Sequence, residues 1–307
     1  MLNSHPALAV PHETAFAVPL YRKRDVFGDL ADPANRRKVA EWILQTKTTR
    51  NERLQMTAEE LTEAVVQAPP TLGSLLAACF ALNARNQGKA RWGDKRPSHV
   101  WNLDAIVELF PDAQFVNVIR DPRACVASMN RVGWSWGGVE SATEIWQRAI
   151  ASAAVWRRKF PADRFLDVHY EKLVTEPKES LQRICGFLGL DPGGIDEMLE
   201  YHKDPNRPTG TPFKEISKPV STDSMNSWEE RLTGTDLALI EGVLGEDMRR
   251  HGYEPYGIRI PIPKERMKEF RRCRARHTKE VRKRKVIEAK RLLTHRYPVA
   301  DLTRTGT

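Results

Sequence analysis

The stretch FVNVIRDPRACVASMNR, residues 115–131, decides the fold that we predict. Its first five residues, 115–119, are mostly β-branched or aromatic, and the run stops at Asp121-Pro122. Proline has no amide proton for a strand ladder and readily opens a helix, so a helix is expected to follow. This pattern predicts a buried strand that delivers Arg120 at its carboxyl end.

The segments on either side repeat the alternation of strand and helix. Short strands are expected within residues 89–95 and 164–170, and helical patterns occur at 100–110 and 141–160. Strands joined by helices of this length pair in parallel and carry helices on both faces of the sheet. We therefore predict an α/β sandwich, whose ligands would bind at the carboxyl ends of the strands.

The first third of the chain is predicted to be helical. A capping box, Thr57 followed by Glu60, opens one of its helices. We interpret residues 34–88, approximately, as a helical insertion. Residues 206–228 have no period and several prolines, so they are expected to form a long loop.

The positive charge is concentrated near the end of the chain. The whole chain carries a net charge of +9, and residues 264–296 contain fifteen Lys or Arg against four Glu. This tail is expected to be helical or disordered. A solvated extension is the default interpretation of such a charge run, and binding to an anionic membrane surface, an acidic acceptor or a nucleic acid is the alternative. The signal predicts no specific nucleic acid.

The composition also indicates in which cellular compartment the protein is expected. No apolar stretch of about 18 residues is present, so the sequence predicts no membrane span. The four cysteines are widely separated, which is typical of reduced thiols and predicts neither a disulfide framework nor a zinc site. We expect a cytoplasmic protein that the tail could hold at a membrane.

Arg120 and Ser128 suggest a site for a phosphate monoester. The strand would present the Arg120 guanidinium at the sheet edge, and Ser128 follows eight residues later on the helix. A guanidinium fork and a hydroxyl together supply charge and directed donors. The alternative is that Arg120 only forms an ion pair with Asp121 or another carboxylate at the strand end.

The sequence resembles the sulfotransferases that use 3′-phosphoadenylyl sulfate (PAPS), within the branch that contains tyrosylprotein sulfotransferases and many bacterial enzymes. The resemblance runs from residue 1 to about 256 and implies a P-loop-like three-layer sandwich with a central parallel sheet. Its motifs are RDPR with Ser128, WGDKRP at 92–97, VHYEKL at 168–173, SWEERL at 227–232, and SHPALAVPHET at 4–14. Arg96 replaces the Thr that is usual in the second motif.

The resemblance implies roles for residues that bind the nucleotide. Arg120 and Ser128 would hold the 3′-phosphate of PAPS and of its product, 3′,5′-bisphosphoadenosine (PAP). Arg131 is a weaker addition to this pair. Tyr170 and Lys218 match residues that line the nucleotide in the tyrosylprotein branch, although Tyr170 could equally belong to the core.

The resemblance also implies a catalytic pair. Glu13 would be the general base, and Lys95 would neutralise the leaving oxygen and the sulfonate; the reaction demands no metal. Taken without the resemblance, Glu13 could cap the next helix and Lys95 could be a solvated lysine at a strand end. His5 and His12 are the alternative bases.

The resemblance implies that the first strand of the family and its Pro-Arg-Ser-Gly-Thr loop, which holds the 5′-phosphosulfate, have no counterpart in these residues. We interpret residues 1–263 as an N-terminally truncated sulfotransferase domain and 264–307 as the basic tail. The expected function is sulfuryl transfer from PAPS to a hydroxyl or amine on a small molecule, glycan, lipid or peptide, impaired in this form. Peptide tyrosine is not specifically implied.

Two other functional classes stay open. One is a non-catalytic relative that binds a nucleotide or a partner and whose tail binds an anionic surface. The other is a kinase-like or NTP-hydrolysing protein, which is disfavoured because the sequence shows neither a Gly-Lys-Ser/Thr loop nor an acidic strand end suited to Mg²⁺.

Overall fold

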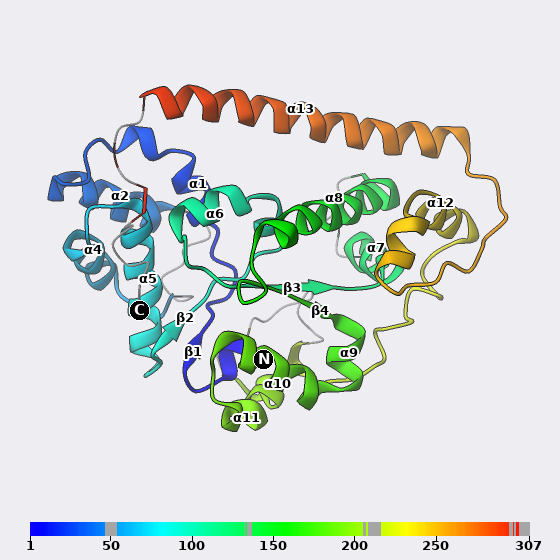
Figure 1. Cartoon of the computed structure of the whole chain (residues 1–307), viewed down its shortest axis with the longest axis horizontal. Coiled ribbons are helices and arrows are strands. Elements are labelled where there is room, and N and C mark those ends of the chain that lie inside the picture. The colour runs from blue at the N-terminus through cyan, green and yellow to red at the C-terminus, as the bar shows by residue number, and fades with distance from the viewer. Residues whose placement is uncertain are drawn as a thin grey trace. The chain divides into compact units, whose positions relative to one another are not determined.

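A computed structural model of the chain (Figure 1) describes residues 1–46, 54–131, 133, 137–204, 207, 216–294, 297, 299 and 300. Parts of the predicted insertion, long loop and tail lie outside these residues, namely 47–53, 206, 208–215, 295, 296, 298 and 301–307. The chain forms two compact units. Unit 1 contains Met1–Phe115, Leu181–Pro219 and the chain from Ala289, and unit 2 contains Val116–Ser180 and Val220–Glu288.

Unit 1 is organised around two short parallel strands, β1 (Leu8–Ala9) and β2 (Arg91–Trp92), in which Leu8 lies opposite Arg91. Its α-helices are α1 (Ala17–Tyr21), α2 (Pro33–Gln45), α4 (Ala58–Gln67), α5 (Leu72–Asn86), α6 (Leu103–Leu109), α10 (Pro177–Leu188, from Leu181 onward) and α11 (Ile195–Leu199). Its 3-10 helices are η1 (Leu2–Ser4), η2 (Arg24–Val26), η3 (Pro97–Trp101), η4 (Pro192–Gly194) and η5 (Tyr201–Lys203).

The predicted helical insertion corresponds to α2, α4 and α5. The capping box at the start of α4 is confirmed, because the Glu60 amide donates to Thr57 Oγ1 over 3.1 Å and the Thr57 amide donates to Glu60 Oε2 over 2.7 Å. The apolar sides of the helices form one core, in which the Phe80 ring stacks on Phe16 and on Trp92 at centroid distances of 5.4 and 5.0 Å. These stacked rings fix α5 against β2.

Unit 2 contains the strands β3 (Phe115–Ile119, from Val116 in this unit) and β4 (Phe165–His169), which form a second two-stranded sheet. Asn117 donates to Asp167 over 2.7 Å, and the Asp121 amide donates to Glu171 over 2.9 Å. Both contacts join residues fifty positions apart, and a constant offset means that the two segments run in parallel. Their carboxyl ends therefore lie at the same edge.

The longer helices of unit 2 build its core from one face each. On α12 the residues Ile240, Leu244 and Met248 have no exposed surface, as the helical period of this segment predicts. They join apolar residues of α7 and α8 in a single cluster. The helices are α7 (Pro122–Arg131), α8 (Gly138–Lys159), α9 (Tyr170–Thr175), α12 (Gly234–Arg250) and α13 (Lys264–Thr294, to Glu288 in this unit).

The prediction of a fully buried strand at 115–119 was wrong. Only Ile119 of β3 is buried, and the Val118 residue is 55% exposed. Successive side chains of a strand point to opposite faces, so Ile119 and Val118 lie on different sides of the sheet. In the described part of unit 2, the face that carries Val118 is open at this position, and the β-prone composition of the run did not distinguish the two faces.

The predicted α/β class is confirmed: the described residues combine two two-stranded sheets with a high helical content. The strands expected in 89–95, 115–119 and 164–170 are all present. The tail forms one helix, α13, over Lys264–Thr294 (orange to red in Figure 1). The division into a domain at 1–263 and a tail stays a prediction, since the two compact units divide the chain differently.

Candidate functional site

Glu13 and Lys95 lie together in unit 1. Glu13 comes four residues after β1 and Lys95 three residues after β2, and the two strands are parallel neighbours. Loops that leave the carboxyl ends of such strands meet at one edge of the sheet. The Lys95 Nζ atom donates to Glu13 Oε1 over 2.6 Å. The structure thus unites the two predicted catalytic residues in an ion pair.

The loop that carries Glu13 is fixed by the loop that carries Lys95. Thr14 Oγ1 donates to Asp94 Oδ1 over 2.8 Å, and His99 Nε2 contacts the other oxygen of the Asp94 carboxylate over 2.8 Å. Glu13 has a φ of +23°, a backbone region that residues other than glycine rarely occupy. Such strain persists only where the surroundings hold it, and it concentrates at functional sites.

The ion pair is accessible. The side chain of Lys95 is 60% exposed and that of Glu13 is 30% exposed. Exposed ion pairs contribute between zero and about 1 kcal/mol to stability, because water solvates the separated charges well. Stability therefore gives little reason for holding Glu13 in a strained conformation, and a chemical role accounts for the arrangement better than a structural one.

The alternative base His5 has a structural role. It is fully buried, its Nδ1 accepts the Ala7 amide proton over 3.0 Å, and its Nε2 faces the Asp191 carbonyl at 2.9 Å. Those contacts require a neutral ring with the proton on Nε2, so neither nitrogen is left to accept a proton from a substrate. His12 is half-buried, next to Glu13 in the chain.

In unit 2, Arg120 and Tyr170 meet at the carboxyl ends of β3 and β4. The Arg120 guanidinium lies over the Tyr170 ring, 4.3 Å from its centroid, and its Nη2 donates to the Ser224 carbonyl over 2.5 Å. The Tyr170 and Ser224 hydroxyls are 2.6 Å apart and share a hydrogen bond. Among the described residues, the buried Nε of Arg120 has no hydrogen-bond partner. A buried, unpaired donor on a cation is suited to an anion.

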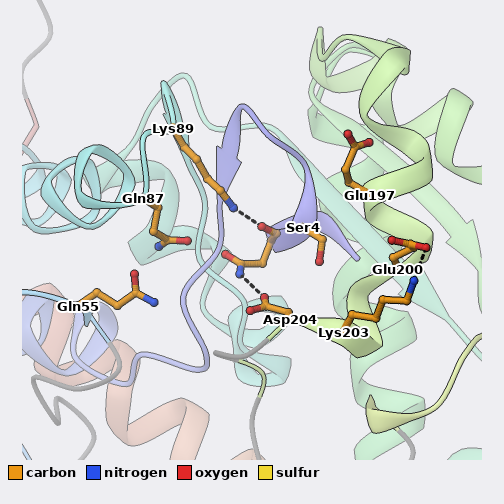
Figure 2. A pocket seen from close by; sticks show the side chains of 9 residues that line it. Ser4, Gln55, Gln87, Lys89, Glu197, Glu200, Lys203 and Asp204 are labelled. Atoms are coloured by element: carbon orange, nitrogen blue, oxygen red, sulfur yellow. Dashed lines mark hydrogen bonds and ion pairs between the residues drawn. The ribbon is translucent and has the colours of Figure 1, made fainter.

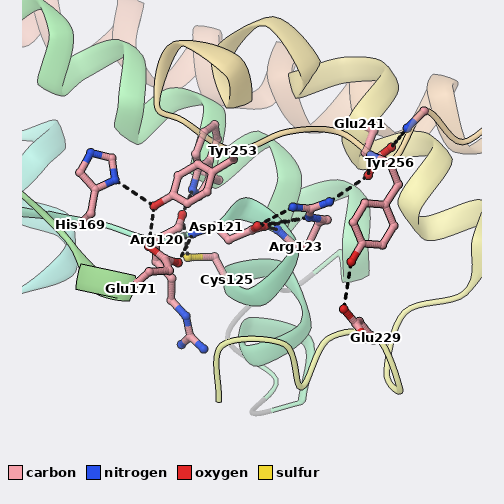
Figure 3. Close-up of polar contacts among 12 residues, drawn as sticks. Arg120, Asp121, Arg123, Cys125, His169, Glu171, Glu229, Glu241, Tyr253 and Tyr256 are labelled. Carbon is pink, nitrogen blue, oxygen red and sulfur yellow. Dashed lines mark hydrogen bonds and ion pairs between the residues drawn. The ribbon is translucent and has the colours of Figure 1, made fainter. Parts of the chain in front are cut away.

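Arg123, not Arg120, neutralises Asp121. Arg123 is buried, and its Nη2 and Nη1 contact Asp121 Oδ2 at 2.7 Å and Glu241 Oε1 at 3.2 Å (Figure 3). Burial alone would lower the pKa of Arg123, but hydrogen bonds and charges from Asp121 and Glu241 outweigh it and raise this pKa. The alternative in which Arg120 merely pairs with Asp121 therefore does not hold, because that carboxylate is already engaged.

Two aromatic rings complete the surroundings of Arg123. Its guanidinium carbon lies 4.5 Å from the Trp228 ring centroid and 4.8 Å from that of Tyr256. The planar guanidinium suits such stacking as well as ion pairs. The sequence motif grouped Arg123 with the phosphate-binding residues. In the structure Arg123 instead fixes the end of β3 from inside the core. Figure 3 shows the Arg120 side chain directed away from Arg123.

Glu171 holds the same strand end from the other side, and the sequence analysis missed it. Its carboxylate accepts the Asp121 amide proton over 2.9 Å and the Tyr253 hydroxyl over 2.7 Å, and His169 Nδ1 lies 3.2 Å from that hydroxyl. Burial and the hydrogen bond to Glu171 raise the pKa of Tyr253 far above its usual value. The available signal was the acidic residue directly after Tyr170.

The remaining predicted residues are less closely placed. Ser128 is half-buried on α7, and Arg131 is the exposed last residue of that helix. Within the described residues, no hydrogen bond or ion pair joins either one to Arg120. Lys218 is an exposed residue of unit 1. The structure thus pairs Glu13 with Lys95 and Arg120 with Tyr170, and the roles assigned to all seven residues stay predictions.

A polar cleft of about 490 Å³ in unit 1 contains none of the predicted residues (Figure 2). Its polar groups largely satisfy one another, since Asn3 donates to Asp204 over 3.1 Å and Lys203 pairs with Glu200 at 2.6 Å. The lining residues are Asn3, Ser4, Gln55, Gln87, Lys89, Glu197, Glu200, Lys203 and Asp204.

The described part of the chain has neither a metal-binding cluster nor a membrane-spanning helix. No three His, Cys, Asp or Glu residues there are grouped as a metal site would need, and none of the helices is both long and apolar enough to span a bilayer. Burial raises the pKa of the Cys125 thiol, 3.8 Å from the Arg120 carbonyl, to about 12. This thiol is therefore protonated at neutral pH and a poor nucleophile.

Comparison with known proteins adds a family and a fold. A family model described as "Sulfotransferase family" matches residues 1–192. A protein-tyrosine sulfotransferase of Drosophila melanogaster is 25% identical over 83% of this chain and 48% of its own length. Protein-tyrosine sulfotransferase 2 of Gallus gallus is 29% identical over 48% of this chain and 42% of its own length. Nodulation protein NoeE of Sinorhizobium fredii is 27% identical over 54% and 45%.

Two solved structures share the fold. The sulfotransferase domain from the olefin synthase of Synechococcus PCC 7002 has a TM-score of 0.56 and 22% identity, covering 81% of this chain and 87% of that domain. The sulfotransferase domain from the curacin biosynthetic pathway has a TM-score of 0.54 and 14% identity, covering 82% and 91%. At these identities the likeness concerns the fold alone. The chain spans about half the length of the curated relatives that it matches.

Proposed function

The chain belongs to the sulfotransferase family, and on this premise we propose that it transfers a sulfuryl group from PAPS to a hydroxyl or amine of an acceptor. The family as a whole catalyses sulfuryl transfer. The choice of PAPS as donor and the residue roles below are our inference from the geometry of each unit. The same holds for the acceptor class, which includes small molecules, glycans, lipids and peptides.

The observation that carries the proposal is the Nε of Arg120 at the edge of the sheet, which is unpaired in the described part of the chain. Its guanidinium lies at the ligand-binding edge of the sheet, with one nitrogen on a neutral carbonyl and the buried Nε unpaired among the described residues. The carboxylate beside it in the sequence is already held by Arg123. A half-buried cation that has no acidic partner among the described residues favours an anionic ligand, and a phosphate monoester suits its fork geometry.

We assign Arg120 to the 3′-phosphate of PAPS and Tyr170 to the nucleotide beside it. The Tyr170 ring supports the guanidinium from one face, which limits its motion and lowers the entropy lost on binding. Ser128, Arg131 and Lys218 are proposed as further contacts to the nucleotide, on the strength of the sequence motifs alone. Selection of a 3′-phosphate would distinguish PAPS from ordinary adenine nucleotides.

In the proposed reaction, the acceptor oxygen attacks sulfur in line and forms a new S–O bond. The bond between sulfur and the bridging oxygen of the 5′-phosphate breaks, and PAP leaves with the bonding electrons. The acceptor proton passes to a carboxylate oxygen of Glu13. Alignment and stabilisation of the developing charge supply most of the catalysis in transfers of this kind.

The Glu13–Lys95 ion pair couples these events. Before transfer, the Lys95 ammonium is neutralised by Glu13 at 2.6 Å. When Glu13 accepts the acceptor proton it becomes neutral, and the positive charge of Lys95 is then available to the leaving oxygen as its negative charge develops. Lys95 would therefore stabilise the transition state more than the bound substrates. Only such a difference in stabilisation accelerates the reaction.

The proposal predicts a strong preference for the 3′-phosphate. PAP should bind about 10- to 100-fold more tightly than adenosine 5′-monophosphate, because one more charge-assisted contact is worth about 1.5 to 3 kcal/mol. Isothermal titration calorimetry of the chain with each nucleotide measures the difference. Equal affinities, or no binding of PAP at millimolar concentration, would contradict the proposal.

A turnover assay distinguishes the proposed enzyme from a non-catalytic relative that only binds the nucleotide. The sequence of 307 residues contains no Pro-Arg-Ser-Gly-Thr stretch like that of the family loop. We propose that this polypeptide by itself transfers sulfate poorly. PAP formation from PAPS with p-nitrophenol as acceptor, slow but above the uncatalysed rate, is the expected result. Selective PAP binding without any turnover would instead support a nucleotide-binding relative.

A further inference from the structure

One face of α13 carries only positive charge and small or aliphatic side chains over most of the helix. Positions three and four residues apart lie on the same side of a helix. The face defined in this way contains six exposed cations in unit 2, and we call it the basic face: Lys268, Arg272, Arg276, Lys279, Arg282 and Lys283. From position 268 to 287 it contains no acidic residue, and Arg272 also pairs with Glu269 at its edge over 3.1 Å.

The opposite side of α13 anchors the helix to unit 2. Phe270 and Cys273 are buried there, and Arg266 pairs with Asp236 through Nη1 at 2.7 Å and with Glu140 through Nε. His277, at helical spacing along the same side, is partly buried. Because these contacts fix the rotation of the helix about its axis, the basic face is held outward and is not part of the core.

Two exposed aliphatic residues lie within the basic face. Val286 is 57% exposed and lies four positions after Arg282 and three after Lys283, so it shares their side of the helix. Ile287, 40% exposed, follows Val286. Contact between water and aliphatic side chains is unfavourable. Their transfer into the boundary of a lipid layer lowers the free energy of the system.

We propose that the basic face of α13 docks onto an anionic phospholipid surface. A helix with cations beside aliphatic side chains lies flat in the headgroup region, and each Lys or Arg close to the surface contributes about 1 kcal/mol. Nucleic acid is the main competitor for such a charge run. The face has no aromatic residue for stacking on bases, and its aliphatic residues have no counterpart in a phosphate backbone.

The docking surface is independent of the proposed sulfuryl transfer. None of its residues is among those assigned to the nucleotide or to the acceptor. Docking would place the protein at the surface of an anionic membrane, where acceptors that are embedded in or bound to that membrane are concentrated. Membrane binding and nucleotide binding can therefore succeed or fail separately.

A sedimentation assay with vesicles tests the proposal. The chain should bind vesicles of 70% phosphatidylcholine and 30% phosphatidylglycerol at 150 mM salt and should not bind pure phosphatidylcholine. The triple variant Lys279→Gln/Arg282→Gln/Lys283→Gln should weaken binding about 20- to 100-fold, since each cation contributes up to about a factor of five. Val286→Ser with Ile287→Ser should weaken it about tenfold.

A matched control removes the same charge from the sides of the helix. The variant Arg274→Gln/Arg284→Gln/Lys285→Gln also loses three exposed cations, but none of them belongs to the basic face. It should change binding by less than about fivefold, and circular dichroism should show the native helix content in every variant. Equal loss in both triple variants, no binding to anionic vesicles, or tighter binding to a 20-base-pair DNA duplex than to vesicles would overturn the proposal.

Discussion

Arg120→Ala is expected to weaken PAP binding about 100- to 1,000-fold. The guanidinium is half-buried, and its Nε is unpaired among the described residues. The neighbouring carboxylate in the sequence, that of Asp121, is paired with Arg123. Removal of one member of a partly buried pair with a phosphate costs between 2 and more than 5 kcal/mol, because the phosphate loses water without gaining a donor. Isothermal titration calorimetry against the unaltered chain measures the loss.

Two further variants make this test specific. Arg120→Lys keeps the charge but loses the planar fork, so it should recover only part of the affinity. Arg249→Ala removes an exposed guanidinium from α12 in the same unit and should leave PAP binding within about twofold. A thermal melt shows whether loss of the contacts to Tyr170 and Ser224 has affected folding. If Arg120→Ala folds and still binds PAP normally, the assignment of the 3′-phosphate is wrong.

Glu13→Gln is expected to slow PAP formation from PAPS by about 10²- to 10⁴-fold, the usual contribution of a general base. Glutamine keeps the size and a hydrogen-bond acceptor for Lys95, but it cannot take the acceptor proton. It also leaves the Lys95 charge unneutralised before transfer, so the coupling between proton uptake and charge release is lost. Single-turnover assays with p-nitrophenol as acceptor measure the rate.

The change at Glu13 should not weaken nucleotide binding. PAP affinity should stay within about threefold or rise, because we assign the 3′-phosphate contacts to other residues and Lys95, assigned to the leaving oxygen of the 5′-phosphate, loses its counter-charge. Glu63→Gln, an exposed change in the middle of α4, is the matched control and should leave the rate unaffected. A Glu13→Gln protein that retains more than a fifth of the rate would show that the base lies elsewhere, and His12 would be the next residue to test.

Local sequence patterns predicted where the strands end and therefore which side chains stand at the sheet edge. The strand β3 stops before Asp121-Pro122, and β4 is followed at once by Tyr170, as expected. The capping box at Thr57 was also readable, because both of its hydrogen bonds lie within four consecutive residues. These features depend on neighbours in the chain, which a sequence displays directly.

Partners that are distant in the chain were not predictable. Two arginines flank Asp121 closely, and nothing local shows which one pairs with it. The answer depends on Glu241, 118 residues away, which accepts from Arg123 and draws it into the core. The exposed face of β3 at Val118 and the anchoring of α13 by Arg266 are likewise set by packing between distant elements.

A structure of the chain bound to PAP tests the central claim most directly. The account predicts that an oxygen of the 3′-phosphate accepts a hydrogen bond from Arg120 Nε, with the Tyr170 ring still against the guanidinium. A 3′-phosphate bound elsewhere, for example on the cations of α13, while Arg120 keeps only its contact to the Ser224 carbonyl, would contradict it.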